Sequence, residues 1–171
     1  VVEAMLPYFT ENFGNASSVY ELGSRNKAVI DQSRAGIAGV LGAKPEEIYF
    51  TAGGSESDNW ALKAAADAYA PKGGHIITTK IEHHAILHTC EYLEGKGIEV
   101  TYLPVDEKGL VDPAAVEAAI RPDTFLISVM FANNEIGTIE PIEQIGKIAH
   151  DHKILFHTDA VQAFAHIPIN V

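Results

Sequence analysis

The chain has 171 residues, and its 12 Lys and Arg against 23 Asp and Glu give a formal net charge of −11 at pH 7. Such an acidic chain lacks the surplus of cations that sequence-independent nucleic-acid binding requires, so we expect no nucleic-acid partner. No stretch approaches the roughly 18 consecutive apolar residues of a membrane helix, and no secretory signal is evident. The single cysteine, Cys90, cannot form an internal disulfide. These features predict a soluble, cytoplasmic, globular protein with no membrane partner.

Apolar residues alternate between helical and strand-like spacing along the chain. The first long helix is predicted from Ser17 or Ser18 to about Leu41, with Gly42 as its stop. The elements predicted after it are a strand over residues 48–51, a helix over 55–70 ended by Pro71 and Gly73–Gly74, a strand over 75–79, a helix over 84–96, a strand over 98–103, a helix over 113–120, a strand over 124–132, a helix over 142–152 and a strand over 154–158.

This alternation of strands and helices predicts an α/β fold. Residues 125–131 form an almost continuous apolar strand, which is typical of a parallel sheet buried on both faces. Right-handed crossovers at this spacing give three αβα layers around a mainly parallel, doubly wound sheet. We expect one domain, and because neither end of the sequence has a polar, turn-rich taper, we expect it to be part of a longer protein.

Polar segments follow four of the predicted strands, at residues 51–59, 80–84, 133–137 and 159–162. In a doubly wound sheet, ligands bind outside the carboxyl ends of the strands. We therefore expect the functional residues in these four segments.

Gly53 and Gly54 form a turn that leads into a helix, and Ser55 follows. Backbone amides and a hydroxyl at such a helix start can bind a phosphate. Alternatively, Ser55 and Asp58 have the spacing of a capping box. The segment lacks the Lys of a nucleotide P-loop and has no GxGxxG motif, which argues against a nucleoside triphosphate or a dinucleotide.

His83 follows the strand at residues 75–79, where an imidazole can stack on a planar ligand or transfer a proton near neutral pH. A lone loop histidine can also be a simple hydrogen-bonding side chain. His84 and His88 share a helical face, but no third metal ligand is evident, so we expect no metal site.

Asn134 and Asp159 each follow an apolar strand. Asn134 can direct its amide at a ligand oxygen, or it can belong to a plain turn with Gly137. A carboxylate at Asp159, in apolar surroundings, needs a cationic or hydrogen-bonding partner, such as a protonated heterocyclic nitrogen. Otherwise Asp159 caps the next helix, and Gln162 faces the same space if the chain turns helical there.

Together, the motifs Gly54-Ser55, residues 82–84, residues 133–137 and residues 159–162 closely resemble those of the cysteine desulfurases. These are pyridoxal 5'-phosphate enzymes of the class V aminotransferase group, with the aspartate-aminotransferase fold. The resemblance covers nearly the whole chain and implies that it is an incomplete large, cofactor-binding domain over residues 1–171. The rest of that domain and the small C-terminal domain would then lie outside this chain.

The resemblance also implies a role for each candidate residue. Gly54 and Ser55 would hold the cofactor phosphate, and His83 would stack on the pyridine ring and assist proton transfer at the substrate. Asn134 would contact the cofactor on the side of its ring oxygen. Asp159 would pair with the pyridine nitrogen. The amide of Gln162 would bind the phenolic oxygen.

The implied reaction removes sulfur from L-cysteine, giving L-alanine and an enzyme persulfide for an acceptor such as an iron–sulfur scaffold. The implied assembly is a homodimer. The family's covalent lysine and persulfide cysteine match no residue here, so the fragment alone is expected to be inactive, and Cys90 is expected to be a packing residue. Two alternatives remain open, namely a selenocysteine lyase or other class V aminotransferase, and a non-catalytic phosphate-binding α/β scaffold.

Overall fold

The computed structural model describes residues 1–70 and 73–171. They form two compact units, one of residues 1–50 and 168–171 and the other of residues 51–167. The second unit contains all six candidate site residues. Pro71, which was predicted to end a helix, lies outside the described residues. No helix in the described part of the chain is long and apolar enough to cross a membrane.

The helices of the first unit are α1 (Val2–Met5), α2 (Pro7–Thr10), α3 (Glu21–Leu41) and the 3-10 helix η1 (Pro45–Glu47). Helix α3 ends as predicted at Gly42, whose φ of +71° lies in the left-handed region that glycine adopts without Cβ strain. It begins later than predicted, because the backbone N–H of Ser17 binds Asn15 Oδ1 in a turn (2.9 Å). Neither serine caps the helix, since Tyr20 is its N-cap residue.

The strand predicted over residues 48–51 is wrong for the described part of the chain. The backbone N–H of Ile48 donates to the Pro45 carbonyl (3.2 Å), and its carbonyl accepts from Arg34 Nε (3.1 Å). A strand needs these groups to pair with a neighbouring strand. The local β-propensity of this segment is therefore not realised.

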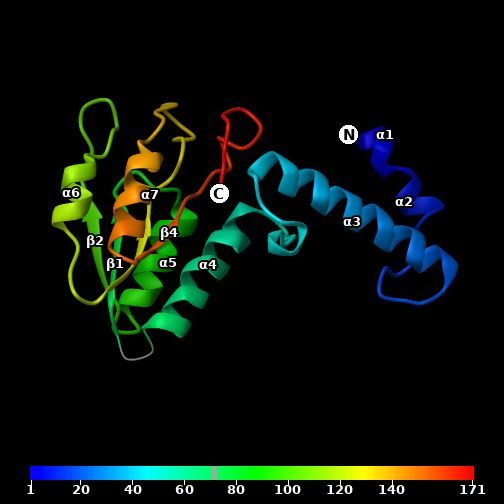
Figure 1. Cartoon of the computed structure of the whole chain (residues 1–171), viewed down its shortest axis with the longest axis horizontal. Helices are drawn as coiled ribbons and strands as arrows, with labels where there is room; N and C mark the ends of the chain where they lie inside the picture. The colour runs from blue at the N-terminus through cyan, green and yellow to red at the C-terminus, as the bar shows by residue number, and fades with distance from the viewer. Residues whose placement is uncertain (71–72) are drawn as a thin grey trace. The chain divides into compact units, whose positions relative to one another are not determined.

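The second unit alternates helices and strands in the predicted order, and Figure 1 labels most of them. They are α4 (Gly54–Tyr69), β1 (His75–Thr79), α5 (His84–Glu94), β2 (Glu99–Leu103), α6 (Pro113–Ala118), β3 (Thr124–Ser128), α7 (Ile142–Asp151) and β4 (Leu155–His157). Strand β3 ends at Ser128, earlier than the predicted Ala132. Beyond it, Ala132 forms an isolated antiparallel bridge with Ile139.

The four strands form one parallel sheet in the order β2-β1-β3-β4. The chain moves from β1 outward to β2, then crosses back over β1 to β3 and continues to β4. The direction of winding therefore reverses between β1 and β3. In such sheets the crevice at this switch point, outside the carboxyl ends of the strands, is where ligands bind.

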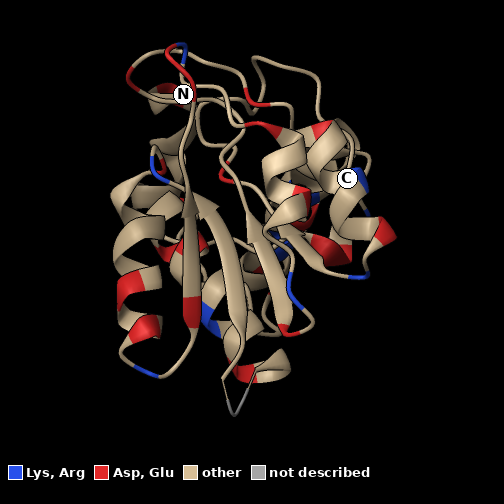
Figure 2. Ribbon diagram, turned by 90° about the vertical axis from the view of Figure 1, so that its left-hand side faces the viewer, with Lys and Arg blue, Asp and Glu red and all other residues tan. Residues whose placement is uncertain are grey.

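Two hydrophobic cores show that helices cover both faces of the sheet. Ile76 of β1 packs in one core with residues of α4 and α5, including Leu62 and Cys90. The next residue, Ile77, faces the other core with residues of α6 and α7, including Ile145. Successive strand residues point to opposite faces, so both faces of β1 are buried. The predicted three-layer αβα arrangement is confirmed, and Figure 2 shows the strands between helices.

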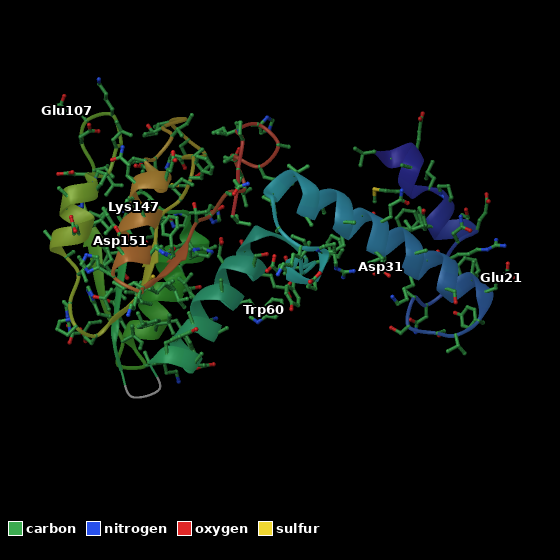
Figure 3. All side chains as sticks on the ribbon, viewed as in Figure 1. Glu21, Asp31, Trp60, Glu107, Lys147 and Asp151 are labelled. Atoms are coloured by element: carbon green, nitrogen blue, oxygen red, sulfur yellow. The ribbon has the colours of Figure 1, made fainter. Side chains whose placement is uncertain are left out.

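The outer side of α7 is polar. Lys147 and Asp151, labelled in Figure 3, form an ion pair one helical turn apart (2.5 Å). Ile145 and Ala149, on the same helix, are buried against the sheet. This separation of polar and apolar sides explains why the helix period could be read from the sequence here.

Candidate functional site

A cavity of about 270 Å³ lies at the switch point. This is slightly smaller than the roughly 300–1,000 Å³ of typical small-molecule sites. Its lining contains all six residues predicted from the sequence and four that were not singled out as ligand-binding, namely Gly54, Ser55, His83, Asn134, Asp159 and Gln162, with Asp58, Met130, Ala132 and Val161. The four polar segments therefore meet at one place, although no strand precedes the segment at residues 51–59 in the described part of the chain.

One end of the cavity is the start of α4. The N-cap residue is Gly53, and no side chain caps the helix, so the capping box of Ser55 with Asp58 is not formed. The amides of Gly54 and Ser55 precede the first intrahelical hydrogen bonds and remain available as donors. Among the described residues, nothing is hydrogen-bonded to the Ser55 hydroxyl. Three donors can thus bind an anion at this end.

Gly54 is needed for the close approach of two segments. A Cβ atom at this position would lie 2.7 Å from Cγ2 of Val161, which also lines the cavity. A larger residue would push Val161 away, so glycine lets the helix start and the segment after β4 approach each other closely.

His83 is the N-cap residue of α5, and its Nδ1 accepts a hydrogen bond from the Ala85 backbone N–H (3.1 Å). A ring nitrogen that accepts carries no proton, so in the neutral imidazole the proton is on Nε2. His84 and His88 stack on each other at 5.3 Å. Within the described ranges, no group of three or more His, Cys, Asp or Glu could hold a metal ion.

Asp159 is 8% exposed, and its Oδ1 accepts a hydrogen bond from the Val161 N–H (2.9 Å). This local turn satisfies one oxygen, but Asp159 does not cap a helix as the alternative expected, because residues 161–166 form turns. The other oxygen has no hydrogen-bond partner in the described part of the chain. One carboxylate oxygen therefore remains available, while Gln162 lies exposed at the rim.

Asp58 is a cavity residue that the sequence did not single out as ligand-binding. It is 4% exposed, and burial together with the charge of Asp159 raises its pKa to about 7. Its Oδ1 lies 3.7 Å from Nε2 of His157, whose pKa burial lowers to about 4. Both groups are therefore neutral between about pH 4 and 7, and this contact is not an ion pair over that range.

Asn134 is exposed and lines the cavity, but it does not make the turn after β3. That turn is made by Asn133, whose Oδ1 accepts from the N–H groups of Glu135 (2.9 Å) and Ile136 (3.0 Å). Gly137 completes it with a φ of +76°. The turn chemistry expected for this segment is present, and it leaves Asn134 free of that task.

Cys90 is fully buried in the core between α5 and the sheet. Burial raises the pKa of its thiol to about 12, which keeps it protonated. A thiol in this state is a poor nucleophile. Cys90 is thus a packing residue, as predicted.

The fold and the cavity define a parallel α/β domain with a switch-point site that combines anion donors with a buried carboxylate. The sequence profile of the family described as "Aminotransferase class-V" matches residues 1–171, and the chain belongs to this family. The family is dependent on pyridoxal 5'-phosphate.

The chain is 64% identical over its full length to "Cysteine desulfurase IscS" of Methanosarcina thermophila, of which it covers 42%. It is 57% identical to the protein of the same name from Clostridium botulinum strain Kyoto, of which it covers 43%. A solved structure described as "SspA in complex with cysteine" superposes with a TM-score of 0.97 at 46% identity, over 99% of this chain and 49% of that one. The chain thus spans less than half the length of these relatives.

Proposed function

We propose that this chain supplies the pyridoxal-phosphate pocket of a cysteine desulfurase, which releases L-alanine from L-cysteine and passes the sulfur to an acceptor. The observation that carries the proposal is the meeting of a buried carboxylate, Asp159, with the donors of Gly54 and Ser55 in one cavity. A phosphate and a protonated ring nitrogen need these two kinds of partner. The relatives named as cysteine desulfurases, and a structural neighbour solved with cysteine, support this substrate.

When bound, pyridoxal phosphate supplies an electron sink, provided that its ring nitrogen stays protonated. The available oxygen of Asp159 would accept a hydrogen bond from the protonated ring nitrogen and so favour its protonated form. The amides of Gly54 and Ser55 and the Ser55 hydroxyl would bind the phosphate, each charge-assisted bond contributing about 1.5–3 kcal/mol. Asn134 and Gln162 would contact the ring oxygen from the rim.

His83 would stack on the ring and move a proton at the substrate amine or thiol. Its Nδ1 is engaged by the Ala85 N–H, so the proton must pass through Nε2. Of the residues in this chain, His83 is therefore the one that we propose to be catalytic. Asp58, neutral below about pH 7, would leave Asp159 as the negative charge beside the ring.

The proposal includes the domain assignment, in which residues 1–171 are part of the large cofactor-binding domain. It also includes a cytoplasmic homodimer that delivers sulfur to a protein acceptor such as an iron–sulfur scaffold. These points follow from the resemblance to the desulfurases and from the family membership.

The test uses the full-length protein with pyridoxal phosphate and L-cysteine. We expect a visible absorption band of the bound cofactor and equimolar alanine and sulfide in the presence of a thiol reductant. Asp159→Ala should weaken cofactor binding about tenfold to a hundredfold, the equivalent of one charge-assisted interaction. Activity on selenocysteine but not on cysteine would favour a selenocysteine lyase. Failure to bind the cofactor would refute the proposal.

A further inference from the structure

Glu82, the residue before His83, is almost fully buried, at 5% exposure. Its Oε1 accepts two hydrogen bonds, from the hydroxyl of Thr79 at the end of β1 (2.8 Å) and from the backbone N–H of Met130 just after β3 (2.9 Å). Its Oε2 is buried without a hydrogen-bond partner among the described residues. One side chain therefore joins the two strands between which the sheet reverses.

A second hydrogen bond joins the same two segments. Nδ2 of Asn133, after β3, donates to the carbonyl of Ile81 (3.0 Å). The two residues that precede His83 are thus both bonded to the β3 side of the switch point. On its other side, the ring of His83 is bonded to Ala85. Hydrogen bonds therefore hold the chain on both sides of this imidazole.

The surroundings of Glu82 determine its charge. The charged groups that affect the pKa of Glu82 are both acidic, namely Asp159 after β4 and Glu140 before α7, and both raise it. A negative charge on Glu82 would in turn raise the pKa of the Cys90 thiol on α5. No cation compensates a negative charge on Glu82 among the residues the structure describes, and burial raises the pKa of Glu82 to about 8. Because Oε1 already receives two donors, the proton belongs on Oε2. Glu82 is therefore a neutral acid at pH 7.

We propose that Glu82 is a positioning residue, a neutral carboxylic acid that ties the loop before α5 to β3 and so fixes where His83 presents Nε2 to the cavity. What His83 then acts on rests on the proposed function, whereas its placement does not. This positioning requires a side chain at residue 82 with one oxygen that accepts two hydrogen bonds and a second terminal group that is uncharged.

Two substitutions separate these requirements. Glu82→Gln keeps the accepting oxygen and an uncharged group of similar shape, whereas Glu82→Ala removes both. Glu140→Ala is the matched control, because Glu140 is also a buried glutamate (3% exposed) with one oxygen accepting a backbone N–H, that of Val111 (3.0 Å), and the other unpartnered. In the described part of the chain its side chain makes no hydrogen bond to the loop that carries His83, although its charge influences Glu82.

The readout is the ¹⁵N spectrum of histidine-labelled full-length protein, with the His83 signals identified by their loss in His83→Gln. In the wild type we expect a protonated Nε2 and an unprotonated Nδ1. Glu82→Gln should retain this pattern. Glu82→Ala should change it to mixed tautomers or broadened signals, while Glu140→Ala should leave it intact even if the protein is less stable.

The second readout is the dissociation constant of pyridoxal phosphate, which we expect to rise about tenfold in Glu82→Ala and to change little in Glu82→Gln. If Glu82→Ala does not fold, Thr79→Val, which removes one of the two donors to Oε1, should shift the His83 signals in the same direction. Unchanged His83 signals in Glu82→Ala, or in Thr79→Val when it stands in, would overturn the inference. A Glu82→Gln spectrum like that of Glu82→Ala would overturn it too, by showing that the charged form is required. A wild type that binds no cofactor would refute the proposed function and still leave the spectral comparison valid.

Discussion

The neutral state of Glu82 makes a quantitative prediction about stability. Its pKa rises from an ordinary value of 4.5 to about 8 in the folded protein. Between these values the folded state holds a proton that the unfolded state has lost, so the free energy of unfolding must fall as the pH rises. The full difference between these two pKa values corresponds to about 5 kcal/mol of unfolding free energy. This is about 1.4 kcal/mol for each pH unit between the two pKa values.

Glu82→Gln removes this titration while keeping a neutral side chain. Relative to the wild type, the variant should therefore gain about 2 kcal/mol of stability between about pH 6 and about pH 7.5. The measurement is urea unfolding of the cofactor-free, full-length protein at both pH values, followed by circular dichroism. Other titrating groups are common to both proteins, so most of their contribution cancels in the difference.

Glu99→Gln is a suitable control. The pKa of Glu99 is lowered by its hydrogen bond to Arg121 and by the charge of that guanidinium. Its contribution to stability is lost only at low pH, so the difference from the wild type should be constant between about pH 6 and about pH 7.5. If the Glu82→Gln difference is also constant over this range, Glu82 is ionised in the folded protein and the argument for a neutral acid fails.

Two substitutions and one labelling experiment test the packing and the backbone. Leu62→Ala, in the core beneath α4 where Leu62 is fully buried, should cost about 2–5 kcal/mol in urea unfolding, and a smaller cost would mean that the core closes over the cavity. Gly137→Ala should cost about 1–2 kcal/mol because of its φ of +76°, since no atom lies within 4 Å of the added Cβ; a neutral result in the same assay would contradict this backbone requirement. Cys90 should resist alkylation by iodoacetamide in the folded protein, as followed by peptide mapping, and rapid labelling would show that α5 opens readily.

The sequence predicted the second unit well because its elements carry strong periodic signals. Ile76 and Ile77 alternate between two cores, and α7 separates Ile145 from Lys147 on opposite sides. The segment at residues 48–51 has the same β-forming composition, yet forms no strand in the described chain. A strand depends on a partner, and the presence of a partner is not encoded in the segment itself.

The candidate site was predicted in its members but not in its electrostatics. His83, Asn134 and Asp159 were identified because each lies in a polar segment after an apolar strand, where ligands bind in such sheets, and because these motifs resemble those of the cysteine desulfurases. Glu82 and Asp58 lie in the same polar segments, but nothing in the sequence indicates their neutral state, which results from burial by segments far apart in the sequence. Asp58 lies on α4 and Glu82 lies in the loop before α5, and from the sequence alone an acid at either place would be expected to be ionised. The role of Asn133, instead of Asn134, in the turn likewise depended on which side chain reached the neighbouring loop.

Strand β4 is only three residues long and forms one edge of the sheet in the described part of the chain, yet it leads directly to Asp159. Its pairing with β3 is continued by the Phe131 N–H, which donates to the Asp159 carbonyl (2.9 Å). Any molecule that binds the Asp159 carboxylate would therefore also stabilise the pairing of β4 with β3 at this edge of the sheet. Amide hydrogen exchange along β4 should slow markedly on ligand binding, because a bound ligand makes local opening of this edge strand less frequent.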